Sequence, residues 1–143
     1  LTGQPISHFQ LQFDDPVDSN HGRVFVLDWP RAHLHQRIDQ RVDCMFAQGL
    51  VDEVHRLQGR YGSLGRTASQ AVGYRETIEL IRGRYGQEET VEQIKTRTRR
   101  FARRQLTWFR SLPECRNITR DEGPTPGEVA RKIVAAAERS TEP

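Results

Sequence analysis

The residues best suited to chemistry in this sequence are arginines crowded between Lys95 and Arg110. At about 100° per residue, a helix over this stretch has a cationic side made of Arg97, Arg99, Arg100, Arg103, Arg104 and Arg110. Its other side, which we expect to face the core, carries Val91, Ile94, Thr98, Phe101, Ala102, Gln105 and Phe109. Acidic residues at i±4 are almost absent, so phosphate is the obvious counter-charge, and guanidinium holds it with paired donors. The stretch therefore points to nucleic acid or a diphosphate.

The same stretch has a second interpretation, in which its arginines pair with Asp or Glu from elsewhere in the fold. From this helix alone the two interpretations stand about even. Trp108 and Phe109 lie near its end, where aromatic rings can stack on bases. We expect Phe109 in the core. Trp108 falls at the border of the two sides, so a core position and a role as a base-stacking surface are equally compatible with the sequence.

The whole chain has the length and composition of one soluble domain. It has 143 residues, of which 35% are hydrophobic and 29% charged, which argues against a disordered chain and against a membrane protein. Cys44 and Cys115 show no metal-type spacing and are interpreted as reduced thiols in the cytoplasm. The five histidines form no metal-ligand set, so no metal site and no catalytic residue is assigned within this chain.

Hydrophobic spacing predicts a mainly helical chain. Residues 1–22 are expected to be a loop or the remnant of an upstream element, and 23–28 a buried strand that Pro30 ends. A weak second strand candidate lies at 116–119. Helices are predicted from residue 31 to a stop at Gly49, over 50–57, over 69–82 before Gly83, and over about 88–112 before Pro113. A last helix begins with the capping box of Thr125 and Glu128, and residues 140–143 are expected to fray.

Three stretches, taken together, resemble the tRNA dimethylallyltransferase (isopentenyltransferase, or IPP transferase) family. They are RAHLHQRIDQRVDCM at 31–45 followed by GLVDEV at 49–54, QAVGYRE at 70–76, and KTRTRRFARRQLTWFR at 95–110. The opening LTGQPIS is similar to the segment that precedes them in that family. Order and spacing agree over about residues 1–112, so the match is specific although no single piece would suffice.

The resemblance implies transfer of a dimethylallyl group from dimethylallyl diphosphate to N6 of the adenine adjacent to the anticodon. It implies two segments that contact the anticodon stem-loop of tRNA. They comprise Gln70, Ala71, Val72, Gly73, Tyr74 and Arg75, and Arg103, Arg104, Gln105, Leu106, Thr107, Trp108, Phe109 and Arg110. Gly73 allows close backbone approach and Arg75 offers a guanidinium fork. Without the resemblance, Gly73 and Tyr74 are better interpreted as a helix-packing glycine and a half-buried tyrosine.

Arg37 and Arg41 are the candidates for binding the diphosphate. They lie one helical turn apart, so both guanidiniums can converge on one anion. Preorganised cations stabilise the negative charge that builds on a departing diphosphate. Pairing with Asp39, Asp43 or Glu53 is about equally compatible with the sequence.

The sequence departs from the family pattern in its nucleotide-binding features. The phosphate-binding loop Gly-x-x-x-x-Gly-Lys-[Ser/Thr] is absent, as are the upstream acidic general base and the Mg²⁺ site that the resemblance implies. The chain opens at Leu1, and we expect it to be cut from a longer protein whose N-terminal P-loop half is its partner. The whole enzyme is expected to be a monomer, and this chain alone to be inactive. Arg103 also stands where the family often has lysine.

The expected fold is therefore the helical C-terminal portion of an α/β P-loop-type nucleoside-triphosphate-hydrolase-like fold, whose strand at about 23–28 belongs to the parent sheet. Three regions are expected: 1–22, a helical tRNA- and diphosphate-contacting region at 23–112, and a C-terminal strand-like segment with a capped helix at 113–143. Two rivals remain, a stand-alone helical RNA-binding module and a structural helical domain whose arginines pair internally.

Overall fold

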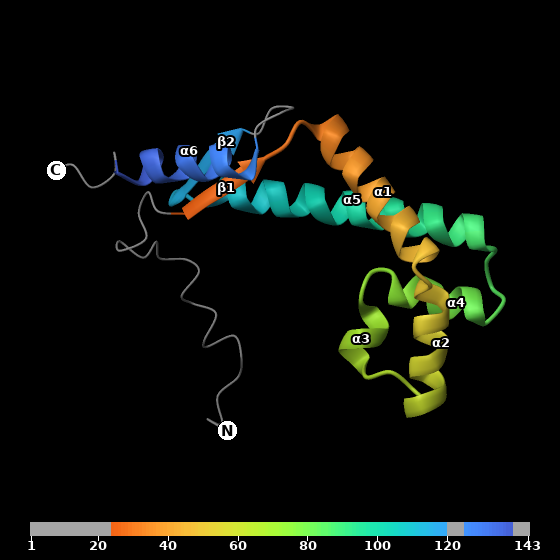
Figure 1. Cartoon of the computed structure of the whole chain (residues 1–143). Coiled ribbons are helices and arrows are strands. Elements are labelled where there is room, and N and C mark those ends of the chain that lie inside the picture. Colours follow the sequence, from red (N-terminus) through yellow and green to blue (C-terminus); the bar gives the residue numbers. More distant parts are fainter. Residues whose placement is uncertain (1–23, 120–124, 139–143) are drawn as a thin grey trace, which may run out of the picture. The chain divides into compact units, whose positions relative to one another are not determined.

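The computed structural model describes residues 24–119 and 125–138, so the expectations for 1–22 and 140–143 lie outside the described residues. The chain forms two compact units. The first comprises Leu1–Pro30 and Gln105–Pro143, and the second comprises Arg31–Arg104. The expectation of a mainly helical chain is confirmed in both (Figure 1).

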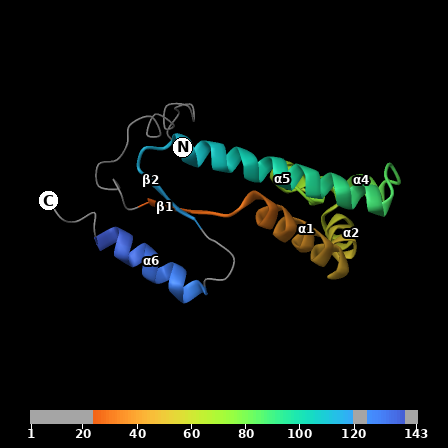
Figure 2. The same cartoon turned by 90° about the horizontal axis from the view of Figure 1, so that it is seen from above.

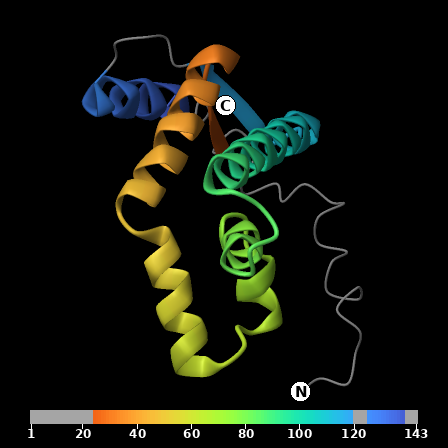
Figure 3. The same ribbon diagram turned by 90° about the vertical axis from the view of Figure 1, so that its right-hand side faces the viewer.

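The second unit is entirely helical. It contains α1 (Arg31–Ala47), α2 (Leu50–Tyr61), α3 (Arg66–Gln70), α4 (Tyr74–Ile81) and most of α5 (Gln87–Ser111). Gly49 separates α1 from α2 in a left-handed conformation with φ 89°, which confirms its predicted role as a stop. The helix α2 then packs against α4, and α4 also contacts α3 (Figure 3).

A small apolar cluster holds α1, α2 and α4 together. Leu50, Val54 and Ile78 are buried at its centre. The partly buried side chains packed against them are those of Met45, Phe46, Leu64, Tyr74 and Ile81. Burial of these side chains is the main favourable term in docking α4 against α2.

The predicted continuous helix over 69–82 is wrong, because the chain is broken between α3 and α4. Ala71 leaves the helical region with ψ 138°, and Gly73 adopts φ 99° and ψ −54°. A positive φ is accessible to glycine but strained for other residues, so Gly73 interrupts the helix. The helix that follows does end before Gly83, as predicted, with φ 72° at that glycine.

The first unit contains a two-stranded parallel sheet and one helix. Strand β1 (Val24–Asp28) pairs with β2 (Cys115–Thr119), in register from Val24 opposite Cys115 to Asp28 opposite Thr119. The weak strand candidate at 116–119 is thus confirmed as the partner of β1. Helix α6 (Pro126–Glu138) lies alongside this sheet (Figure 2), and Arg116 donates to the carbonyl of Ala136 at 3.4 Å.

The predicted capping box begins α6. The Thr125 backbone N–H donates to Glu128 Oε2 at 2.6 Å, and the Glu128 N–H donates to Thr125 Oγ1 at 3.4 Å. The Thr125 hydroxyl also donates to Glu128 Oε2 at 3.0 Å. The two bonds that the carboxylate accepts from Thr125 favour its ionised form, and they hold the pKa of Glu128 below its usual value. Within the described ranges, no helix combines the length and the apolar character that crossing a membrane requires.

Candidate nucleic-acid interface

Two arginines of α5 are held by carboxylates from other helices of the second unit. Arg97 Nη1 lies 2.5 Å from Oε1 of Glu76, and Arg99 donates to both oxygens of Asp39 at 2.9 and 2.5 Å. The interpretation in which arginines of this stretch pair with Asp or Glu from elsewhere in the fold is therefore confirmed for Arg97 and Arg99. Their partners lie on α4 and α1, so the residues four positions away along α5 do not reveal them.

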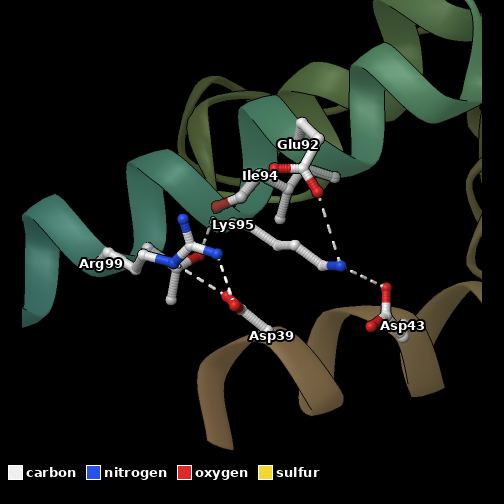
Figure 4. A network of polar contacts seen from close by, with 7 residues as sticks. Asp39, Asp43, Glu92, Ile94, Lys95 and Arg99 are labelled. Carbon is white, nitrogen blue, oxygen red and sulfur yellow. Dashed lines mark hydrogen bonds and ion pairs between the residues drawn. The ribbon is translucent and has the colours of Figure 1, made fainter. Parts of the chain in front are cut away.

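Lys95 belongs to the same network and joins α5 to α1 (Figure 4). Its Nζ lies 2.7 Å from Oδ1 of Asp43 and 3.6 Å from Oε1 of Glu92. The hydrogen bond that Lys95 donates to Asp43 raises the pKa of Lys95 above its usual value, and the bonds that Arg99 donates to Asp39 raise the pKa of Arg99 in the same way. This part of α5 uses its cations for tertiary structure.

Arg100 and Arg104 remain available for a ligand. Both side chains are exposed, and neither has a carboxylate partner in the part of the chain that the structure describes. They are four residues apart, so they lie on the same side of α5, one turn from each other. The Arg104 guanidinium carbon lies 5.8 Å from the centroid of the Phe101 ring, a cation–π distance.

Phe101 does not belong to the core, contrary to the expectation from its position on the helix. Its side chain is 46% exposed, whereas Ile94 is only 1% exposed and Thr90 is fully buried. The buried positions of α5 are confined to its first half, so apolar periodicity beyond Ile94 no longer predicts burial. An exposed aromatic ring beside a free guanidinium suits contact with a nucleic-acid base.

The 70–75 segment spans the break between α3 and α4. Gln70, Ala71, Val72 and Arg75 are exposed there, and Gly73 is buried. Arg75 has no carboxylate partner among the described residues, so its guanidinium is open to an anion.

Tyr74 has a structural environment. Its ring packs against the Leu50, Val54 and Ile78 cluster, and its hydroxyl donates to the carboxylate of Glu53. That hydrogen bond, together with burial, raises the pKa of Tyr74 above its usual value. The arrangement matches the interpretation of Tyr74 as a half-buried packing residue.

The end of α5 belongs to the first unit. Gln105, Thr107 and Arg110 are exposed there, while Leu106 and Phe109 are half-buried. Trp108 is 50% exposed and lies 4.9 Å from the Phe109 ring, centroid to centroid, at a tilt of 54°.

Arg110 and Arg103 are exposed residues with partners of their own. Arg110 Nη2 lies 3.3 Å from Oδ2 of Asp28, a long contact between exposed groups that contributes little to stability. Arg103 also takes part in a contact and is not counted among the free cations.

On α1, both candidates for diphosphate binding are exposed. The three carboxylates that the sequence offered as their partners bind other residues, because Asp39 binds Arg99, Asp43 binds Lys95 and Glu53 binds Tyr74. Arg37 takes part in a contact of its own. Arg41 has no ion pair within residues 24–119 and 125–138. In those same ranges, no group of three His, Cys, Asp or Glu side chains is arranged to hold a metal ion.

Sequence reasoning missed Glu76, which it placed only within the QAVGYRE stretch, because its burial depends on tertiary packing. Arg100 was predicted on the cationic side of the helix but not within the tRNA-contacting segments, although it lies four residues before Arg104 and therefore shares its side of the helix.

Comparison with known proteins identifies the family. A family model described as IPP transferase matches residues 1–112. The tRNA dimethylallyltransferase of Rhodopirellula baltica is 52% identical over 117 residues, covering 82% of this chain and 35% of that protein. The tRNA dimethylallyltransferase 1 of Trichlorobacter lovleyi is 48% identical over 115 residues, covering 78% of this chain and 37% of that protein.

Solved structures agree with this assignment. The tRNA delta(2)-isopentenylpyrophosphate transferase of Staphylococcus epidermidis superimposes with a TM-score of 0.75 at 28% identity, covering 96% of this chain and 43% of that one. A tRNA isopentenylpyrophosphate transferase from Bacillus halodurans gives 0.71 at 30% identity, covering 82% and 40%. The chain belongs to the IPP transferase family, and it spans little more than a third of the length of the curated relatives it matches.

Proposed function

We propose that this chain supplies the tRNA contacts and a diphosphate contact of a tRNA dimethylallyltransferase. The reaction transfers the dimethylallyl group of dimethylallyl diphosphate to N6 of the adenine adjacent to the anticodon. The observation that carries the proposal is the pair of exposed guanidiniums of Arg100 and Arg104, which face no carboxylate of the described chain. Their neighbours Arg97 and Arg99 are held in ion pairs. The position of each arginine on α5 therefore decides whether its guanidinium is open to a phosphate.

The proposed contacts divide by chemistry. Arginine side chains of the 70–75 segment and of the 103–110 stretch hold phosphates of the anticodon arm, which fixes the RNA without reading its sequence. Gln105 and Thr107 offer hydrogen bonds to ribose or base. Trp108 is half exposed and offers a stacking surface.

The diphosphate contact is assigned to Arg37 or Arg41 on α1. During transfer, N6 attacks the first carbon of the dimethylallyl group, the bond from that carbon to the diphosphate oxygen breaks, and N6 loses a proton. Negative charge grows on the leaving diphosphate, and a fixed guanidinium lowers the barrier by stabilising it. The adenine must leave its stack to reach the donor, as in other enzymes that act on a base.

Mg²⁺ and a general base are parts of the expected whole enzyme, but the described residues do not fit a metal site. The sequence also holds no P-loop motif. This chain alone is therefore expected to transfer no dimethylallyl group. We assign the whole enzyme to the cytoplasm, where its tRNA substrate is found. We expect it to be a monomer.

The test is direct binding of RNA to the 143-residue chain. A labelled anticodon stem-loop with adenine after the anticodon is titrated at several salt concentrations, beside a duplex RNA with the same number of phosphates. We expect salt-dependent binding that favours the stem-loop. No binding even at low salt would contradict the proposal. Equally tight binding of both RNAs would instead favour a general RNA-binding module.

A further inference from the structure

Glu76 is a buried carboxylate that holds two parts of the second unit at once. The residue is only 3% exposed. Its Oε2 accepts the backbone N–H of Gly73 at 2.8 Å, while its Oε1 accepts from Arg97 Nη1 at 2.5 Å. One side chain thus links the break between α3 and α4 to the middle of α5.

The backbone of Gly73 is held from its other side as well. Thr77, which is fully buried, donates its hydroxyl to the Gly73 carbonyl at 2.7 Å. A Cβ built on Gly73 would lie 3.4 Å from Cε of Met45 on α1. The glycine is therefore fixed in its positive-φ conformation by hydrogen bonds at both of its peptide groups and by close packing.

We propose that Glu76 and Arg97 are positioning residues, which fix the Gly73 backbone and thereby present the 70–75 segment to RNA. This inference rests on the proposed function, because it assumes that the segment contacts RNA. Neither residue needs to touch the RNA itself. Glu76 is buried, and the guanidinium of Arg97 is committed to it.

The energetics favour such a coupling. A buried carboxylate is costly unless it is paired and hydrogen-bonded, so Glu76 depends on both Arg97 and the Gly73 N–H. Conversely, the Gly73 N–H has its acceptor only while Glu76 stays in place. A disturbance at Arg97 on α5 therefore reaches the exposed residues Gln70 and Arg75, which flank the fixed glycine.

The experiment uses a substitution for which net charge and loss of positioning predict opposite changes in RNA affinity. Glu76→Gln raises the net charge of the chain from +3 to +4, so charge alone would tighten RNA binding. Gly73 and Arg97 donate to different oxygens of Glu76, and glutamine replaces one of these oxygens with an NH2 group, which cannot accept. We expect anticodon stem-loop affinity to fall roughly 5- to 30-fold, the scale of one buried hydrogen bond. The Gly73 amide should also exchange with solvent faster.

Glu79→Gln is the matched control. Glu79 lies on the same helix, is more exposed, and binds Arg82 and Arg84 at 2.9 and 2.6 Å as its partners among the described residues. The Glu79→Gln variant has the same net charge as Glu76→Gln, and its RNA affinity should be equal to that of the unsubstituted chain or slightly higher. Equal affinities of the two variants, or unchanged Gly73 exchange in Glu76→Gln, would overturn the inference while leaving the proposed function standing.

The remaining outcomes are also decisive. If the unsubstituted chain binds no RNA, the proposed function fails and the positioning role fails with it. If Glu76→Gln loses its helical circular dichroism, Glu76→Asp takes its place. This variant keeps the charge but is one methylene too short to span both partners. Weaker RNA binding and faster Gly73 exchange in folded Glu76→Asp would support the inference, and wild-type behaviour in both would overturn it.

Discussion

Arg99 donates hydrogen bonds to both carboxylate oxygens of Asp39, from Nε at 2.9 Å and from Nη2 at 2.5 Å, and thereby links α5 to α1. Lys95 and Asp43 make a second tie, 2.7 Å long, between the same helices. The cations of α5 therefore fall into two groups. Some hold helices of the second unit together, whereas Arg100 and Arg104 are exposed and have no carboxylate partner among the described residues.

Arg99→Met should destabilise the protein by about 1 kcal/mol, because it removes a bidentate pair that is about one-third exposed and leaves Asp39 without its partner. Urea unfolding measures the change. Arg84→Met is the control, since Arg84 is a more exposed arginine bound to Glu79, and it should change stability by less than about 0.5 kcal/mol. Equal losses in the two variants would contradict a structural role specific to Arg99.

Gly73→Ala should destabilise the protein by about 1–3 kcal/mol. A Cβ at φ 99° is strained, and it would meet Met45 Cε at 3.4 Å, the lower limit of ordinary van der Waals contact. Gly59→Ala provides the contrast within α2, because nothing lies within 4 Å of its added Cβ. Alanine there should stabilise the helix by roughly 0.5–1 kcal/mol. The midpoints of thermal or urea unfolding should therefore move in opposite directions.

Glu128 should titrate below its ordinary pKa of 4.5 in the folded chain. The backbone N–H of Thr125 is the main cause, and its hydroxyl adds to it. A depressed carboxyl pKa contributes stability that is present above the ordinary value and is lost as the pH falls through the folded value.

A carboxyl-carbon NMR titration measures this pKa directly. Thr125→Ala removes the hydroxyl but keeps the backbone N–H, so the pKa should rise only part of the way back. A Glu128 that titrates at its ordinary value in the unsubstituted chain would show that the capping box does not form in solution.

Local sequence patterns predicted the parts of the fold that depend on local physics. Apolar spacing and Gly49 predicted α1, and Pro113 marked the end of α5 to within two residues. Thr125 and Glu128 predicted the start of α6 because a capping box is encoded in four consecutive residues. The break at Gly73 was missed, because a glycine within an apolar repeat does not reveal its φ.

The candidate site was predicted only in outline, since its electrostatics depend on distant residues. Arg97 and Glu76 are 21 positions apart, and Arg99 and Asp39 are 60 apart. The local i±4 rule cannot detect such partners. Phe101 was misplaced for a related reason: helical periodicity assigns it to a side of the helix, but the fully buried positions of α5, Thr90 and Ile94, lie in its first half.

The central claim is that the free guanidiniums of α5 meet RNA phosphates, and the salt dependence of RNA binding tests it most directly. Arg104→Ala and Arg60→Ala each remove one exposed arginine, from α5 and from α2, so the net charge changes equally. For Arg104→Ala we predict weaker binding of the anticodon stem-loop and a plot of log affinity against log salt that is shallower by about 0.7. Arg60→Ala should keep the original slope. Identical affinities and identical slopes for the two variants would contradict the claim.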